Sequence, residues 1–262
     1  MSSSASTLSP AQRPRVAVIS ALQAELSAVL EHLQGARRET RAGREFVIGR
    51  LHGVDVVAAL SRIGKVSAAT TATVLIEHFG ATRMVFTGLA GGLHPDARVG
   101  DVVVGTAYLQ HDLDASPLFP RHEVPLYGVS RFAADPALAQ ALVEAARASL
   151  ADLPELIGAE ARAQFRLERP AVHQGLIVSG DRFVATSREC AALRAELPEA
   201  LAVEMEGAAV AQVCHDYGLP FAAVRTISDR ADDQAHVDFP LFLNSVASRY
   251  SAAIVDALLK AA

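Results

Sequence analysis

The sequence has only two cysteines and no tryptophan. Cys190 and Cys214 lie far apart in the chain and match no paired spacing of a metal or redox site. Isolated thiols are ordinary packing residues in a reducing compartment. The cysteine content therefore excludes a zinc-ribbon or CxxC type of site and favours a cytoplasmic protein.

The chain also lacks an excess of basic residues. Its 24 lysines and arginines are outnumbered by 29 aspartates and glutamates, which gives a net charge of −5. A nucleic-acid binder needs a basic face for phosphate contacts. The arginines within residues 37–44 alternate with polar residues and predict a solvated surface. We therefore expect no nucleic-acid partner.

Long apolar runs are absent as well. The longest apolar segments have the length of a strand and fall short of a membrane span. Residues 1–13, MSSSASTLSPAQR, are serine-rich and have no apolar core, unlike a secretory signal. We expect a disordered tail over residues 1–13, no membrane partner and a cytoplasmic location.

Strand-like and helix-like segments alternate along the remaining chain, with no internal repeat and no linker. This pattern predicts one α/β domain over residues 14–262, with a mixed central β-sheet flanked by α-helices. Expected strands are 15–20, two runs within 47–61, 83–87, 99–108, 172–179 and 221–227. Expected helices are 21–33, 65–79, 136–150, 187–197, 205–217 and 240–260, with a loop over 111–131 and connecting structure over 151–170.

One segment near the C-terminus carries the strongest chemical signal. Glu204 and Glu206 lie in an otherwise apolar run, and the expected strand 221–227 ends in Ser228 and Asp229. Buried carboxylates are costly unless they are paired or act on a ligand. Acids at the carboxyl end of a strand lie where open α/β sheets bind ligands. These residues predict a sugar-hydroxyl anchor and a general acid at one small molecule.

Each of these acids also has a simpler interpretation. Glu206 can favour the positive end of the following helix, although its apolar neighbours favour a functional role. Glu204 can be a second partner at the site or a helix-end partner. Asp229 can be a turn residue, and Arg225 would lower its pKa if the strand extended that far with both side chains on one face.

Three further features are candidates for binding. Small residues over 88–92 would let backbone N–H groups approach a ligand, although a tight turn without a ligand is an equal alternative. Glu25 shares a helix face with Ala21 and Leu22 and would point inward; the alternative is a solvated glutamate. Phe183 follows an expected strand and can stack on a flat base or belong to the core.

Several familiar motifs are missing. Gly64-Lys65 lacks the rest of a P-loop, and residues 88–92 lack the GxGxxG spacing. His111-Asp112-Leu113-Asp114 has metal-ligand types but no second cluster, so we predict a hydrogen-bonded loop and no metal. The absence of GxSxG and Cys–His signatures excludes the common covalent hydrolases.

Dispersed motifs in the right order resemble one family from Val16 to Leu259. They are VAVISALQAEL, SRIGKVSAATTATVLIEHF, TGLAGGL, VGDVVV, HDLDAS, GLIVSGDRFV and AVEMEGAAVAQVCHDYGLPFAAVRTISDRADDQAH. The chain resembles the 5′-methylthioadenosine/S-adenosylhomocysteine nucleosidases of the purine nucleoside phosphorylase superfamily. The resemblance implies a nucleoside phosphorylase-like fold, a homodimer, a small-molecule nucleoside substrate, and neither metal nor organic cofactor.

The resemblance also implies a role for each site residue. Glu25 would activate water, Glu206 would bind a ribose hydroxyl, and Asp229 would protonate the purine at nitrogen 7. Phe183 would stack on adenine while the backbone of Val184 reads its edge. The remaining substrate-binding residues would be Met205 beside the ribose, Ser228 supporting the acid, Phe239 closing the pocket, and Ala90 and Gly91.

The chain departs from the family pattern at three places. Leu89 replaces a small polar residue, Arg62 replaces a glycine, and the loop over 112–130, which commonly helps to form the pocket for the 5′ group, differs. The 5′ group therefore stays open among methylthioadenosine, S-adenosylhomocysteine, 5′-deoxyadenosine and a futalosine-type nucleoside. Two rival functions are a phosphate-dependent purine nucleoside phosphorylase, which Glu25 opposes and Arg62 weakly favours, and a non-catalytic nucleoside-binding protein.

Overall fold

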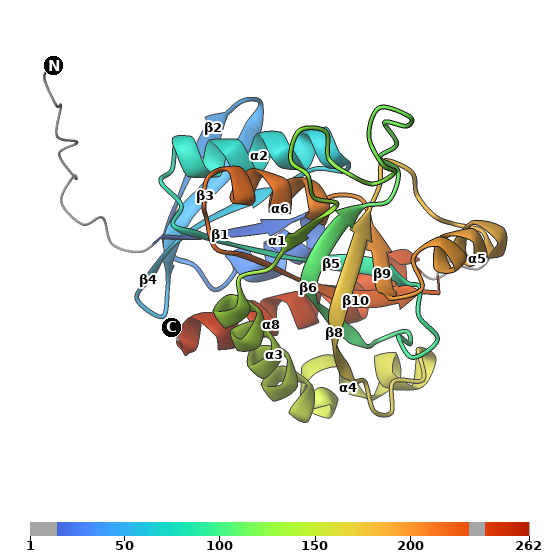
Figure 1. The fold of residues 1–262 in the computed structure, drawn as a ribbon. Helices are drawn as coiled ribbons and strands as arrows, with labels where there is room; N and C mark the ends of the chain where they lie inside the picture. The colour runs from blue at the N-terminus through green and yellow to red at the C-terminus, as the bar shows by residue number, and fades with distance from the viewer. Residues whose placement is uncertain (1–14, 231–238, 262) are drawn as a thin grey trace, which may run out of the picture.

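The computed structural model describes residues 15–230 and 239–261 (Figure 1). The predicted disordered tail over residues 1–13 lies outside this part of the chain. Within it, no helix combines the length and the apolar character needed to cross a membrane.

Ten strands of the described chain form one mixed sheet. They are β1 (Arg15–Ser20), β2 (Gln34–Arg41), β3 (Arg44–Leu51), β4 (Val54–Leu60), β5 (Arg83–Gly92), β6 (Val102–Gln110), β7 (Arg131–Ala133), β8 (Val172–Ser179), β9 (Ala200–Glu204) and β10 (Phe221–Asp229). Their order is β10-β6-β8-β9-β5-β1-β4-β3-β2, with β7 beside β6. Because β10 also pairs with β5, the strands β5, β10, β6, β8 and β9 form a closed circuit.

Helices cover both faces of this sheet (Figure 1). They are α1 (Gln23–Leu30), α2 (Lys65–Glu77), α3 (Pro136–Ala151), α4 (Leu153–Gln164), α5 (Ser187–Glu196), α6 (Gly207–Asp216), α7 (Phe239–Phe242) and α8 (Ser248–Lys260), with a π-helical turn over Leu243–Ala247. Helices α2 and α6 pack together on one face, while α8 packs with α1 and α3 on the other. The predicted single α/β domain with a mixed sheet flanked by helices is therefore confirmed.

The most strongly patterned elements match the sequence prediction. Strands β1 and β8 have the predicted bounds: β1 is buried from Val16 to Ser20, and β8 is buried over its second half, from Leu176 to Ser179. Helix α3 begins as expected after Asp135, whose carboxylate accepts a hydrogen bond from the backbone N–H of Leu138 at 2.8 Å. Most other predicted boundaries differ from the structure by a few residues.

Four elements of the described chain were missed. Strand β2 pairs only with β3 at the edge of the sheet, and nearly all of its residues are exposed, so no buried face marks it in the sequence. Arg37, Arg38 and Arg41 do lie on this solvated surface, whereas Arg44 is half-buried at the start of β3. Helix α4 forms where connecting structure was predicted, and it buries Leu153, Ile157 and Ala161 at a spacing of about one turn. The short strands β7 and β9 were also not predicted.

Of the two alternatives for residues 88–92, the tight turn is wrong. Strand β5 continues to Gly92, because this segment pairs with β10 on one side and with β9 on the other. Gly91 lies opposite both Asp229 and Val203 in these pairings. The glycine-rich segment is thus part of the central sheet, where it lies beside the ends of β9 and β10.

Candidate active site

A cavity of about 120 Å³ lies at the carboxyl ends of β5, β9 and β10. It is also bordered by the residues that follow β1, β4 and β8. Nine of the ten predicted site residues line it: Ala90, Gly91, Phe183, Val184, Met205, Glu206, Ser228, Asp229 and Phe239. Segments that are distant in the sequence therefore meet at one small space.

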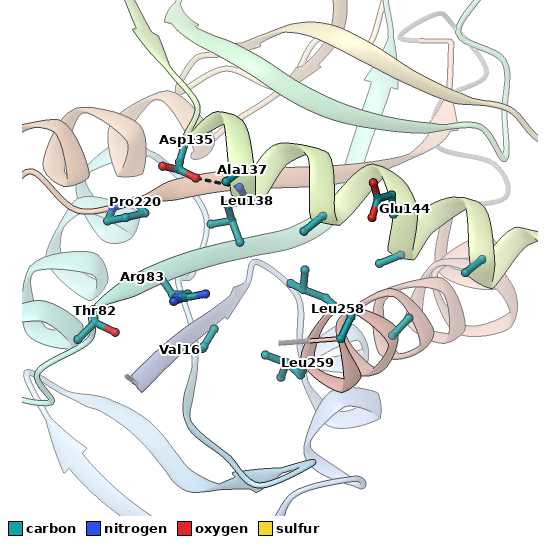
Figure 2. A pocket seen from close by; sticks show the side chains of 15 residues that line it. Val16, Thr82, Arg83, Asp135, Ala137, Leu138, Glu144, Pro220, Leu258 and Leu259 are labelled. Carbon is teal, nitrogen blue, oxygen red and sulfur yellow. Dashed lines mark hydrogen bonds between the residues drawn. The ribbon is translucent and has the colours of Figure 1, made fainter. Parts of the chain in front are cut away.

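A larger groove of about 680 Å³ lies between α3 and α8 (Figure 2). Its walls include Val16 and Arg83 at the amino ends of β1 and β5. The carboxylate of Asp135 in this groove is engaged as the cap of α3. Since open α/β sheets bind ligands at the carboxyl ends of their parallel strands, the smaller cavity is the candidate site.

Asp229 is the last residue of β10 and lines the cavity. The strand runs two residues beyond the predicted end, with a register irregularity between Ile227 and Asp229. The hydroxyl of Ser228 donates to the Asp229 carboxylate at 2.6 Å. This contact orients the carboxyl group, as the sequence analysis anticipated for Ser228.

Glu204 connects several elements around the site through hydrogen bonds of its carboxylate. Its carboxylate accepts hydrogen bonds from the backbone N–H of Gly207 at 2.9 Å and of Glu206 at 3.1 Å, and from the hydroxyl of Ser179. It also accepts from the guanidinium of Arg225 at 2.8 Å. The helix-end interpretation of Glu204 is therefore confirmed, because it holds the start of α6.

Arg225 is the residue whose role the sequence analysis missed. Its side chain is 1% exposed and pairs with Glu204. The guanidinium also donates to the carbonyl oxygen of Phe86 at 3.1 Å and lies 4.1 Å from the centre of the Phe86 ring. An arginine inside an apolar strand needs a buried anionic partner. This requirement was the signal in the sequence, and the partner is Glu204.

Glu206 lies at the N-cap position of α6, but its side chain makes no capping hydrogen bond there. Its carboxylate instead accepts from the backbone N–H of Gly64 at 2.8 Å. Gly64 has a φ of 94°, a conformation that favours glycine. Burial, aided by the charge of Glu204, raises the pKa of Glu206 to about 7. Glu206 thus lies at the helix end, as the simpler interpretation had it, but its carboxylate is bound by Gly64 and not by the helix.

Glu25 is fully buried, so the solvated alternative is wrong, and its carboxylate accepts from the backbone N–H of Leu22, a residue of the cavity lining, at 3.4 Å. A Cβ added to Gly88 would lie 3.7 Å from the Glu25 carboxyl oxygen and 3.5 Å from the Arg225 guanidinium, so both groups flank one point of β5. Among the described residues, Oε1 of Glu25 has no hydrogen-bond partner. Burial raises the pKa of Glu25 to about 8; Arg225 opposes this rise and the charge of Glu206 adds to it.

The other end of the cavity is more open and apolar. Phe183 is 46% exposed, so it is not a core residue, and Val184 lies beside it in the lining. Leu22, Ile63 and Met205 supply further apolar surface. A flat apolar group can lie against Phe183 while a polar group reaches the acids.

The described residues include no group of three or more His, Cys, Asp or Glu side chains placed to hold a metal ion. The segment His111-Asp112-Leu113-Asp114 is instead hydrogen-bonded, as predicted. Asp112 pairs with Lys65 at 2.6 Å, and Asp114 accepts from the backbone N–H of Ser116 at 3.0 Å.

Comparison with known proteins shows the family of the chain. Residues 15–260 match the family model of the phosphorylase superfamily. A 5′-methylthioadenosine/S-adenosylhomocysteine nucleosidase of Shewanella denitrificans is 36% identical over 248 residues, which cover 94% of this chain and 98% of that protein. The chain belongs to this nucleosidase family. The relative from Geobacillus kaustophilus, with the same name, is 37% identical over 94% of this chain and 96% of its own length.

Solved structures of the family share the fold. The nucleosidase of Neisseria meningitidis in complex with methylthio-immucillin-A has a TM-score of 0.83 and 38% identity, and the match covers 95% of this chain and 99% of that one. The enzyme of Colwellia psychrerythraea in complex with adenine has a TM-score of 0.81 and 33% identity, covering 95% of both chains. A futalosine hydrolase of Helicobacter pylori has a TM-score of 0.79 and 29% identity, covering 95% of this chain and 98% of that one. The predicted nucleoside phosphorylase-like fold is thereby confirmed.

Replacing Glu204 should destabilise the protein strongly. In Glu204→Gln the charge of Arg225 stays buried without an anionic partner, and we expect a loss of about 3–5 kcal/mol in the free energy of unfolding. Glu45→Gln, which removes the charge from an exposed pair with Arg38, should cost less than about 1 kcal/mol. Urea denaturation of both variants checks this; equal losses would contradict it.

Glu25 should make stability depend on pH. Its pKa rises from 4.5 to about 8 on folding, so between these values the folded protein holds a proton that the unfolded chain has lost. Glu25 therefore lowers the free energy of unfolding as pH rises through this window, by up to about 1.4 kcal/mol per pH unit. Urea denaturation at several pH values should show a shallower decline in Glu25→Gln; an unchanged slope would contradict the burial of a neutral carboxyl.

Proposed function

We propose that this protein hydrolyses the N-glycosidic bond of 5′-substituted adenosines, giving adenine and the 5′-substituted ribose. The observation that carries the proposal is the meeting of Glu206, Asp229 and Phe183 in one cavity, with Glu25 buried beside a residue of its lining. Family membership supports the same chemistry, because the named relatives are nucleosidases and two related structures hold adenine or methylthio-immucillin-A.

Asp229 acts as the general acid. It donates a proton to nitrogen 7 of the purine while the bond between ribose C1′ and nitrogen 9 breaks, and the bonding electrons leave with the base. The base then departs as neutral adenine, which lowers the barrier. The hydrogen bond from Ser228 to Asp229 supports this role by holding the carboxyl in one orientation.

Glu25 acts on the attacking water. It accepts a proton as the water oxygen bonds to C1′, so the products are adenine and a free sugar hydroxyl. The unpartnered Oε1 of Glu25 is available to bind that water. Arg225 favours the ionised form that this step requires, and positive charge developing on the sugar favours it further.

Glu206 binds the ribose. Its free oxygen accepts from a ribose hydroxyl, while the Gly64 N–H holds the other oxygen at 2.8 Å. Met205 lies beside the sugar, and Phe239 closes the cavity. Phe183 stacks on adenine, the Val184 backbone binds its edge, and the small residues Ala90 and Gly91 leave room for the base.

The phosphorylase alternative needs a phosphate cradle, and Arg62 was its candidate cation. Arg62 donates to the carbonyl oxygen of Gly43. A phosphate beside Glu25 would also meet an acidic group. We therefore favour water over phosphate as the nucleophile.

We also propose that the protein is a cytoplasmic homodimer. Large apolar side chains are exposed at the start of α2 and on the loop after β6: Val66 is 78% exposed, Leu118 84% and Leu126 91%. Ile63, which lines the cavity, is 59% exposed. A second copy covering these side chains would also shelter the cavity from water. Cys190 and Cys214 are buried and form no disulfide with each other, which supports the location.

An adenine-release assay tests the proposed activity. The purified protein should free adenine from 5′-methylthioadenosine, S-adenosylhomocysteine or 5′-deoxyadenosine at the same rate with and without phosphate. Product chromatography distinguishes the alternatives. A phosphorylated sugar would indicate a phosphorylase, and binding without any product would indicate a nucleoside-binding protein.

Asp229→Asn should lower kcat by about 10²–10⁴-fold, because the amide cannot supply the proton. KM for the best substrate should change little, since an amide of the same shape preserves the cavity. Steady-state kinetics measure both constants. Turnover equal to that of the unmodified enzyme would remove Asp229 from the mechanism.

Val66→Glu should dissociate the dimer, because it places a charge in an apolar contact. Light scattering after gel filtration should then give the mass of one chain, 27.6 kDa, in place of twice that mass. Ala148→Glu, in the groove beside α3 at the other end of the sheet, is the matched control and should leave the dimer intact. A dimer that persists in Val66→Glu would place the interface elsewhere.

A further inference from the structure

Lys65, Asp112 and Asp181 form a closed ring of hydrogen bonds beside the candidate site. The backbone N–H of Lys65 donates to Asp181 Oδ1 at 2.7 Å, and the Lys65 ammonium donates to Asp112 Oδ1 at 2.6 Å. The backbone N–H of Asp181 donates to Asp112 Oδ2 at 2.8 Å. Each residue of the ring is thus bonded to both of the others.

The ring joins three segments that are far apart in the sequence. Lys65 begins α2, Asp112 follows β6, and Asp181 follows β8. All three segments leave the sheet at the end where the cavity lies. Strands β6 and β8 pair up to Gln110 and Ser179, and the backbone N–H of His111 donates to the Ser179 carbonyl oxygen at 2.9 Å, so the segments of Asp112 and Asp181 already lie side by side. No strand pairing of the described chain joins the start of α2 to them, so the ring supplies that connection.

Two residues of the ring, Lys65 and Asp181, are followed or preceded in the sequence by residues of the site. Gly64, which precedes Lys65, holds the carboxylate of Glu206 through its backbone N–H. Phe183 and Val184 follow Asp181 by two and three residues, and both line the cavity. The ring therefore lies between the side chain that we assign to the ribose and the segment that we assign to adenine.

The ring is sheltered compared with pairs on the protein surface. The side chains of Lys65 and Asp112 are 16% and 29% exposed, whereas Arg38 and Glu45 are 64% and 51% exposed in a surface pair. Burial tends to raise the pKa of Asp112, but hydrogen bonds from Lys65 and from the Asp181 N–H lower it below its usual range. The carboxylate is therefore ionised at neutral pH and accepts both bonds.

We propose that Lys65, Asp112 and Asp181 are positioning residues, which set the distance between the adenine-binding segment and Glu206. The inference rests on the proposed nucleosidase function, and none of the three residues needs to touch the substrate. Without the ring, the start of α2, where Gly64 holds Glu206, is no longer fastened to the segment that carries Phe183, so one nucleoside no longer meets both at once.

Loss of the ring should change substrate binding more than the chemical step. Contacts to the base are present in the ground state and in the transition state, so their loss raises KM more than it lowers kcat. Free adenine contacts only the base-binding segment, so its inhibition constant rises with KM. A residue that only stabilises the fold would leave both constants unchanged in the folded fraction.

Asp112→Asn is the sharpest variant. The ring needs two acceptor oxygens at this position, and asparagine offers one oxygen and one NH₂ group of the same shape. In either orientation its NH₂ faces another donor, from Lys65 or from the Asp181 N–H. Lys65→Met removes the same contact from the other side, and Lys65→Arg restores a cation.

Asp55→Asn is the matched control. It makes the same chemical change in a carboxylate of similar exposure, 22%, which pairs with Arg50 at 2.8 Å. This pair lies on the β3–β4 hairpin, whose residues do not line the cavity.

We expect Asp112→Asn and Lys65→Met to raise both KM for 5′-methylthioadenosine and the inhibition constant of adenine about tenfold, the size of one charge-assisted hydrogen bond. Their kcat should fall by less than about threefold, following the same reasoning on uniform binding. Lys65→Arg should recover part of the loss, and Asp55→Asn should match the unmodified enzyme. Thermal unfolding of every variant reports the folded state.

The outcomes distinguish a failure of the positioning role from a failure of the proposed nucleosidase function. Variants with lowered melting temperatures but unchanged KM and adenine inhibition would overturn the positioning role. If Asp112→Asn fails to fold, the same constants for Lys65→Met decide. If the unmodified protein releases no adenine from any substrate, the nucleosidase proposal fails; calorimetric binding of adenine to the same variants then decides on the ring, and unchanged affinity overturns it.

Discussion

The pair of Arg225 and Glu204 is the contact on which the site depends. Both side chains are almost completely buried, and each is costly to bury without the other. Glu204 joins the end of β9, the start of α6 and β8 through its hydrogen bonds, while Arg225 fastens β10 to the carbonyl oxygen of Phe86 in β5. A single ion pair thus holds the strands that carry Glu206 and Asp229. The arrangement of the acids follows from a contact that itself needs no substrate.

The same pair sets the charge balance of the cavity floor. Glu25, Glu204 and Glu206 lie near one cation, Arg225, whose charge is already shared with Glu204. Burial therefore leaves Glu25 and Glu206 with raised pKa values of about 8 and 7. Both carboxyl groups therefore hold their protons more readily than an exposed glutamate does.

The fold and most of the site were readable from the sequence because they depend on buried runs and on acids in apolar surroundings. Strands β1 and β8 and the N-cap at Asp135 follow from local pattern alone. What was missed depends on tertiary contacts. The Arg225–Glu204 pair and the bond from Gly64 to Glu206 join residues whose proximity no local spacing encodes. Strand β5 extends through residues 88–92 because β9 and β10 pair with it there, although the glycines locally suggest a turn.

The exposed strand β2 has a consequence for how copies of this protein meet. One side of β2 pairs with β3, so its other side presents free backbone donors and acceptors, which another chain can extend into a longer sheet. Arg37, Arg38 and Arg41 stand along this edge in solvent, with Glu39 paired to Arg41 at 2.8 Å. Desolvating this row of charges would oppose any sheet-to-sheet joining. These exposed charges thereby discourage fibre-like growth through β2.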